Sequence, residues 1–317
     1  MRYWTAVGIG VCCCCLLAAA PAVQNAPPVT GQWLIDGRIV EGKVELTLRG
    51  NRGQQGHFSS SSMLPLQQLR GLNYELMNSA GSNVRFEIVR DAGTLACEGY
   101  FKDGAGAGAF AFSPDPRFAS AMQSLGYGGL STDKVFAMAV HDVTLAYVHD
   151  LRALGVDGVS SDQLIAMRIH GVEIDYIKDM QALGYSELSP DKLIAMRIHG
   201  VSTEFAREFK NLGYNPSVDQ MIAMRIHGVA PEFAGDLKAM GYGSVSPDQM
   251  IAMRIHGAKI DFVKEVRSLG YTPTVDQLVS MRIHGVTPEY IRNLQGRGMK
   301  NLTIDQLVSL KIHGIQD

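Results

Sequence analysis

The chain has 317 residues, which corresponds to about two domains, and its 46% of hydrophobic residues can build a sizeable core and argue against a wholly disordered protein. The 29 Lys and Arg side chains are balanced by 31 Asp and Glu, for a net charge of −2. Nucleic-acid binding needs a concentrated basic face, so we expect no nucleic-acid partner.

Residues 1–22 have the pattern of a secretory signal peptide. Arg2 precedes an apolar stretch from Val7 to Ala20, and Ala20-Pro21-Ala22 offers the small-x-small pattern at which signal peptidase cleaves. The apolar stretch is too short to span about 30 Å of hydrocarbon as a helix. We therefore expect export by the Sec route, cleavage after Ala22 and a periplasmic or secreted protein. If the segment is retained instead, it anchors the chain and brings it into contact with the membrane.

Four of the five cysteines, Cys12 to Cys15, lie inside the predicted signal peptide. A consecutive run suits neither a disulfide framework nor a metal site, so we expect these thiols to behave as small hydrophobic groups. A lipoprotein site is an alternative, which the residues before Cys12 fit poorly. After cleavage only Cys97 remains, so the exported protein has no internal disulfide and depends on packing. We expect Cys97 to be buried in a strand and not reactive.

Alternating polar and apolar residues between Trp33 and Phe112 predict β-strands. The strands are expected at residues 43–49, 83–90, 94–101 and 109–112, the second and third forming a hairpin. Residues 64–72 are expected to form a single helix or a loop, and the serine run 59–62 a loop. Residues 31–112 are thus predicted to be a small antiparallel β domain.

Two features of this region could indicate a functional site, but the neighbouring residues do not support one. The glycine-rich stretch 103–108 lacks the Lys of a phosphate-binding loop and no helical pattern follows it, so we expect a flexible turn between strands. His57 has no carboxylate or Cys at ligand spacing, and we assign it no role.

Residues 115–317 repeat with a period of 28 or 29 residues. The marker of the period is a histidine: His141, His170, His199, His227, His256, His284 and His313. A fixed period in this range is typical of a stacked repeat array. We count about seven units, the first of which lacks its first helix, and both terminal units are degenerate as capping requires. The expected fold class is therefore α+β, a small antiparallel β domain followed by an α-solenoid.

Residues 188–214 show why each unit is predicted to be a helical hairpin. Ser189 is a favourable N-cap for the first helix, and Gly200 ends that helix as a left-handed C′ residue. Gly213 ends the second helix, and Tyr214 is placed to fold back on its last turn in a Schellman motif. Because helices of about ten residues are marginal alone, neighbouring units must stabilise each other.

The periodic histidines do not predict a metal site. Equivalent positions on stacked helices lie about 8–10 Å apart, whereas zinc ligands must converge within about 2 Å of one ion. We expect the histidines to stabilise helix ends, and we expect neither a metal nor a cofactor. A methionine also recurs in each first helix and is expected to form a core stripe: Met167, Met196, Met224, Met253 and Met281.

A basic residue recurs just before each of the last six histidines: Arg168, Arg197, Arg225, Arg254, Arg282 and Lys311. It lies within the apolar sector of its helix, where an unpaired charge is costly. One structural role is pairing with free helix-end carbonyls; another is pairing with the periodic aspartates Asp162, Asp191, Asp219, Asp248, Asp276 and Asp305 of adjacent units. The functional alternative makes the five arginines the partner-binding residues of a groove that takes a carboxylate-bearing segment.

The repeated string LIAMRIHGV…EF…LGY resembles the helical repeats found C-terminal to the membrane zinc metallopeptidase of bacterial antirepressor and beta-lactam-sensing receptors. The resemblance covers residues 115–317, about two-thirds of the chain, and extends less distinctively to the small sheet domain. The transmembrane helices and the HExxH motif of that peptidase are absent here, so neither its activity nor its catalytic residues carry over. The resemblance implies a bacterial envelope protein whose repeats sense or bind a partner.

Known catalytic motifs are missing from the sequence, and a repeated site suits catalysis poorly, because catalysis needs different groups to converge on one point. We therefore expect a non-enzymatic protein-interaction or signalling module of the cell envelope. Its partner would be a protein or peptide with an acidic or carboxylate-ended segment. The alternative is a structural envelope protein that assembles end to end, and an enzyme site around His57 is a third hypothesis.

Overall fold

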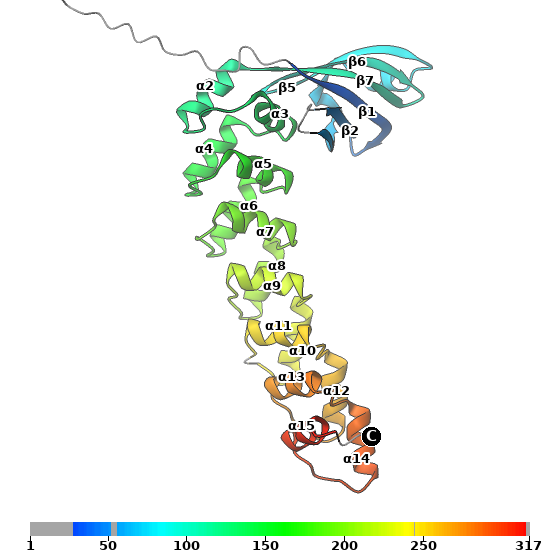
Figure 1. Ribbon diagram of the computed structural model, residues 1–317, viewed down its shortest axis with the longest axis vertical. Helices are drawn as coiled ribbons and strands as arrows, with labels where there is room; N and C mark the ends of the chain where they lie inside the picture. The colour runs from blue at the N-terminus through cyan, green and yellow to red at the C-terminus, as the bar shows by residue number, and fades with distance from the viewer. Residues whose placement is uncertain (1–27, 52–55, 244, 315–317) are drawn as a thin grey trace, which may run out of the picture. The chain divides into compact units, whose positions relative to one another are not determined.

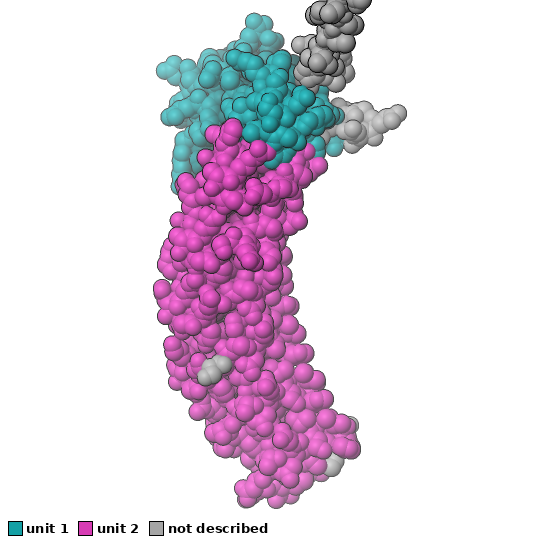
Figure 2. Space-filling view, turned by 90° about the vertical axis from the view of Figure 1, so that its left-hand side faces the viewer, with its two compact units in different colours: residues 1–145 teal, residues 146–317 magenta. Residues whose placement is uncertain are grey.

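The computed structural model describes residues 28–51, 56–243 and 245–314. The chain divides into two compact units, residues 1–145 and 146–317 (Figure 2). The predicted signal peptide lies outside the described residues. In the described part of the chain, no helix combines the length and hydrophobicity needed to cross a lipid bilayer.

The first unit is built on an antiparallel seven-stranded sheet with the order β3-β2-β1-β7-β6-β5-β4 (Figure 1). The strands are β1 (Val29–Val40), β2 (Lys43–Asn51), β3 (His57–Pro65), β4 (Leu69–Arg70), β5 (Ser82–Arg90), β6 (Gly93–Lys102) and β7 (Ala105–Pro114). A 3-10 turn, η3 (Leu66–Gln68), and a short helix, α1 (Tyr74–Met77), connect β3 to β4 and β4 to β5. The predicted antiparallel β domain is confirmed.

Three predictions within the sheet are wrong. The serine run 59–62 is not a loop but the middle of β3, where Ser61 lies opposite Thr47 with their hydroxyl oxygens 2.8 Å apart. Pairing with β2 along the whole strand outweighs the weak strand preference of serine. Residues 64–72 form neither one helix nor a loop, because η3 is followed directly by β4. The turn predicted for 103–108 is confined to its first two residues, and the rest belongs to β7.

The glycines of β7 stand where aromatic rings of neighbouring strands need room. A Cβ on Gly108 would come 2.7 Å from the indole nitrogen of Trp33, and one on Gly106 would come 2.5 Å from the ring of Phe101. Trp33 is fully buried, packs on Phe86 and Phe101 at ring distances of 5.0 and 5.5 Å, and donates a hydrogen bond to the Glu98 carbonyl. Gly106 and Gly108, which the sequence pattern assigns to a turn, therefore leave the space that the core rings of Phe101 and Trp33 occupy.

Cys97 lies in β6 and is 1% exposed, which confirms its predicted burial. Burial raises the pKa of its thiol to about 12. At pH 7.5 the thiolate fraction is therefore about three orders of magnitude below that of an ordinary cysteine, whose pKa is about 8.5. For a chain that starts at residue 23, we expect iodoacetamide to label Cys97 in denaturant and not in buffer. Rapid labelling of the folded chain would contradict the packing of β6.

The first helices of the repeat region belong to the compact unit of the sheet. They are α2 (Pro116–Ser124) and α3 (Thr132–Val140). Phe136 of α3 is 1% exposed and packs on Phe58, Phe110 and Phe112 at ring distances of 5.3, 5.8 and 5.3 Å. The sheet thus buries one of its faces against a helix that the sequence assigns to the repeats.

From residue 146 onward the chain is an array of short antiparallel helices, which confirms the predicted α-solenoid after the β domain (Figure 1). We call the first helix of each hairpin an A helix: α5 (Ser161–Ile169), α7 (Pro190–Ile198), α9 (Val218–Ile226), α11 (Pro247–Ile255), α13 (Val275–Ile283) and α15 (Ile304–Ile312). The B helices are α4 (Leu145–Ala153), α6 (Ile174–Ala182), α8 (Thr203–Asn211), α10 (Pro231–Ala239), α12 (Ile260–Ser268) and α14 (Pro288–Gly296).

The A helices form one layer of the array and the B helices form a second layer. Successive A helices from α5 to α15 contact each other, as do successive B helices from α6 to α14. The layers twist along the array, so that the A helices lie to the right of the B helices at α5 and to their left at α15 (Figure 1). The periodic methionines of the A helices are fully buried, as predicted.

Local backbone chemistry sets the ends of these helices as predicted. Ser189 caps α7 by accepting a hydrogen bond from the Lys192 amide. At the end of α8, Gly213 has a φ of +90°, and the Tyr214 amide donates to the Phe209 carbonyl in a Schellman motif.

Candidate interaction surface of the helical repeats

The predicted partner-binding arginines stack on the aromatic rings of the preceding B helices. The distances from the cation to the ring centroid are 5.2 Å for Arg168 over Tyr147, 4.9 Å for Arg197 over Tyr176, 5.1 Å for Arg225 over Phe205, 5.5 Å for Arg254 over Phe233, 5.1 Å for Arg282 over Phe262 and 4.4 Å for Lys311 over Tyr290. Each contact joins two successive hairpins. These ring contacts were not predicted from the sequence, although an aromatic residue precedes each basic residue by 20 or 21 positions.

Three of the arginines also reach a helix-end carbonyl of the preceding unit. The Nε atoms of Arg225, Arg254 and Arg282 donate to the carbonyls of His199, His227 and His256 at 3.3–3.4 Å. For these three arginines, this confirms the predicted pairing with free carbonyls at helix ends.

The other two arginines differ. Arg168 forms an ion pair with Glu173 at 2.7 Å. The Nε of Arg197 is buried and has no hydrogen-bond partner in the described residues. Its guanidinium lies over the Tyr176 ring, whose burial raises the pKa of that phenol to about 12.

Five of the six periodic aspartates have side-chain partners other than these arginines. Four of them accept hydrogen bonds from a Gln of the preceding A helix: Gln163 to Asp191 at 2.6 Å, Gln220 to Asp248 at 3.0 Å, Gln249 to Asp276 at 3.1 Å and Gln277 to Asp305 at 3.4 Å. In the remaining unit, Lys192 forms an ion pair with Asp219 at 3.2 Å. Each of these glutamines also closes the capping box of its own helix, so one amide both caps a helix and links two units.

The glycine that follows each A helix makes room for the arginine of the next unit. Gly200 has a φ of +71°, and a Cβ there would lie 3.0 Å from an Nη atom of Arg225. We expect Gly200→Ala to lower the free energy of unfolding by about 2–3 kcal/mol, since it adds a displaced guanidinium to the left-handed strain. Gly213→Ala is the matched control, because its φ is +90° and its surroundings are open. Equal losses in urea unfolding would show that the Arg225 contact contributes nothing.

The second unit exposes one isoleucine in each of six successive A helices, which was not predicted from the sequence. Each is the last residue of an A helix, and 52–57% of each is exposed: Ile169, Ile198, Ile226, Ile255, Ile283 and Ile312. We call these six residues the isoleucine stripe. Of the residues in the recurring string MRIH, only the methionine is buried.

The isoleucine stripe lies on a face of the A layer whose preceding helical turn is apolar in α5, α7, α9 and α11, whereas α13 and α15 have Ser280 and Ser309 there. Ile194 and Ala195 precede Ile198 by one helical turn and are half-buried, and Asp191 lies a further turn back and is exposed. At the other end, the C-cap His199 is exposed next to Ile198. The face thus carries aspartates along the N-terminal edge of the A helices and histidines with arginines along their C-terminal edge.

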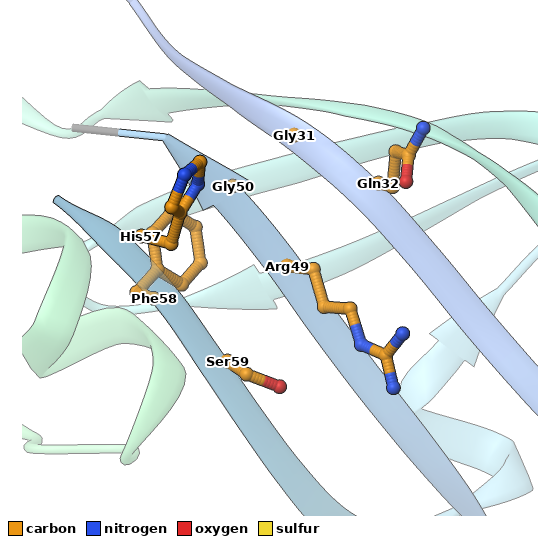
Figure 3. A pocket seen from close by; sticks show the side chains of 7 residues that line it. All are labelled: Gly31, Gln32, Arg49, Gly50, His57, Phe58 and Ser59. Carbon is orange, nitrogen blue, oxygen red and sulfur yellow. The ribbon is translucent and has the colours of Figure 1, made fainter. Parts of the chain in front are cut away.

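The sheet carries a separate open cavity of about 550 Å³ beside the start of β3 (Figure 3). Its ionisable side chains are His57 and Arg49, and the Arg49 guanidinium points away from the imidazole (Figure 3). The described lining contains no carboxylate or thiol that could work with His57, so this geometry supplies no acid–base pair.

In the described part of the chain, no three His, Cys, Asp or Glu side chains are arranged to hold a metal ion. No protein-family model matches the chain, and no curated protein matches it.

Proposed function

We propose that this protein is a non-enzymatic interaction or sensing module of the bacterial cell envelope, which binds a segment of a protein partner along the A helices. The observation that carries the proposal is the isoleucine stripe. Isoleucine is among the residues most often buried, and here the same position is exposed in six successive units. Large apolar surface aligned in this way is typical of an interaction site.

The arginines enter this proposal in a supporting role. Their ring contacts hold each A helix to the preceding B helix, and the carbonyl bonds of Arg225, Arg254 and Arg282 link successive A helices, so together they fix the spacing of the stripe. The placement in the envelope is supported by the signal-peptide pattern at the N-terminus and by the resemblance of the repeats to those of envelope receptors.

Affinity capture from a native envelope extract tests the proposal. The bait is a tagged chain that starts at residue 23, beside a variant with Ile198, Ile226 and Ile255 changed to Ser. The matched control changes Val40 and Met63 to Ser, which are 54% and 46% exposed in the first unit. We expect a specific protein to be captured by the wild type and the control and lost by the stripe variant.

Equal capture by all three baits would remove the stripe from the proposal. Light scattering on the same samples addresses the alternative of end-to-end assembly. Growth of the particle with concentration, unaffected by the stripe variant, would favour a structural envelope protein.

A further inference from the structure

The geometry points to one kind of occupant for the isoleucine stripe. We infer that the stripe binds an extended acidic segment in the polyproline II conformation, with an apolar side chain at every third residue. The inference rests on the proposed function, and it adds the conformation, the period and the charge of the partner segment.

The period follows from the spacing of the stripe. Packed helices lie about 8–10 Å apart, so successive isoleucines of the stripe are separated by about that distance. A polyproline II helix has three residues per turn and rises about 3.1 Å per residue, which places every third side chain on one face at about 9.3 Å. In a β-strand, side chains on one face repeat at about 6.6 Å. In an α-helix, they recur about every 5.4 Å. The polyproline II repeat matches one side chain per unit, whereas an α-helix approaches this spacing only with every seventh residue, at about 10.5 Å.

The twist of the array favours the same partner. The A helices pass from one side of the B helices to the other between α5 and α15 (Figure 1), so a row with one residue per A helix does not run straight along the second unit. A straight helix or a flat surface of another folded protein would leave such a row after a few units. An extended segment has no fixed partners within its own backbone and can follow all six isoleucines with about 16 residues.

The charges along the two edges of the A layer indicate that the bound segment is acidic. The C-terminal edge of the A layer carries the exposed histidines and the arginines. The Nη atoms of Arg197, Arg225, Arg254 and Arg282 have no hydrogen-bond acceptor in the described residues. They can therefore donate to carboxylates of a bound segment. The opposite edge carries the exposed aspartates, which would repel an acidic row. A polyproline II segment has three rows of side chains, and one of them can be acidic. Such a segment can bind in the chain direction that places the acidic row over the arginines and away from the aspartates.

Fluorescence anisotropy with synthetic peptides tests the inference. The probe is an 18-residue peptide of six Leu-Pro-Glu triplets, beside a peptide of the same composition with its leucines at irregular spacing and a peptide of six Leu-Pro-Lys triplets. We expect one Leu-Pro-Glu peptide to bind per chain, with each of the other two peptides at least tenfold weaker. Changing Ile198, Ile226 and Ile255 to Ser should weaken its binding at least tenfold, and changing Val40 and Met63 to Ser should not.

The outcomes separate the inference from the proposed function. Equal binding of the regular and irregular peptides overturns the three-residue period, and stronger binding of the Leu-Pro-Lys peptide overturns the acidic row. Failure of all three peptides, while the stripe variant still loses a captured envelope protein, overturns the extended segment and leaves the interaction module intact. Capture that is insensitive to the stripe removes the proposed function itself.

Discussion

Replacing Trp33 by Ala should lower the free energy of unfolding of the sheet unit by about 4–5 kcal/mol. The indole is fully buried, and its ring contacts with Phe86 and Phe101 join β1 to β5 and β6. Gly108 has no side chain that could fill the cavity, and the Glu98 carbonyl would lose its indole donor. Single domains are stable by only about 5–15 kcal/mol, so the sheet would become marginal.

Urea unfolding followed by circular dichroism measures this loss. Trp33→Phe is the control, because a smaller ring keeps most of the packing and loses only the hydrogen bond and part of the volume. A loss of unfolding free energy below about 1 kcal/mol in Trp33→Ala would mean that the indole of β1 does not pack on the rings of β5 and β6. In a chain that starts at residue 23, Trp33 is the only tryptophan, so its blue-shifted emission in the wild type reports the same burial.

The fold was predictable from sequence wherever the signal is local. Capping residues, helix-ending glycines and the 28- or 29-residue period specify each hairpin, because each feature satisfies backbone groups within a few residues. The wrong predictions concern residues whose conformation is set at a distance. The serine run forms a strand because it belongs to β3, which pairs with β2 at nine positions, four of them at the serines. The glycines of β7 are extended because Trp33 and Phe101 lie against them.

The candidate site was predictable only in part, and for a related reason. The sequence places an arginine in the apolar sector of each A helix, but the ring beneath it belongs to another helix 20 or 21 residues earlier. The exposure of the isoleucine stripe could not be predicted from the sequence for the same reason. Which side of an amphipathic helix is buried depends on its neighbours. In the A helices, packing within the array buries the Met or Leu side chains but leaves the last Ile exposed.

The triple variant with Arg197, Arg225 and Arg254 changed to Ala should destabilise the array by about 3–5 kcal/mol. Each arginine loses a ring contact worth about 0.5–2 kcal/mol, and Arg225 and Arg254 also lose their carbonyl bonds to the preceding unit. These contacts join neighbouring hairpins, and the cooperativity of a repeat array comes from such interfaces. We therefore expect a lower and broader unfolding transition in guanidinium chloride.

Two matched variants separate this structural role from partner binding. The same three arginines changed to Lys should recover at least half of the lost stability, since Lys311 occupies the equivalent position over Tyr290 at 4.4 Å. The variant with Ile198, Ile226 and Ile255 changed to Ser should unfold within about 1 kcal/mol of the wild type, because these side chains are more than half exposed.

An Arg→Ala array as stable as the wild type would contradict the stabilising role of the ring contacts, and the variant could then test the arginines directly in partner binding. If the predicted loss is observed, a binding defect of that variant cannot be assigned to the arginines, because the spacing of the isoleucine stripe changes with it. The Lys and Ser variants then carry the binding test. Lys keeps the charge at the C-terminal edge of the A helices and removes the planar donor, whereas Ser removes the exposed apolar surface and keeps the arginine side chains with their ring and carbonyl contacts.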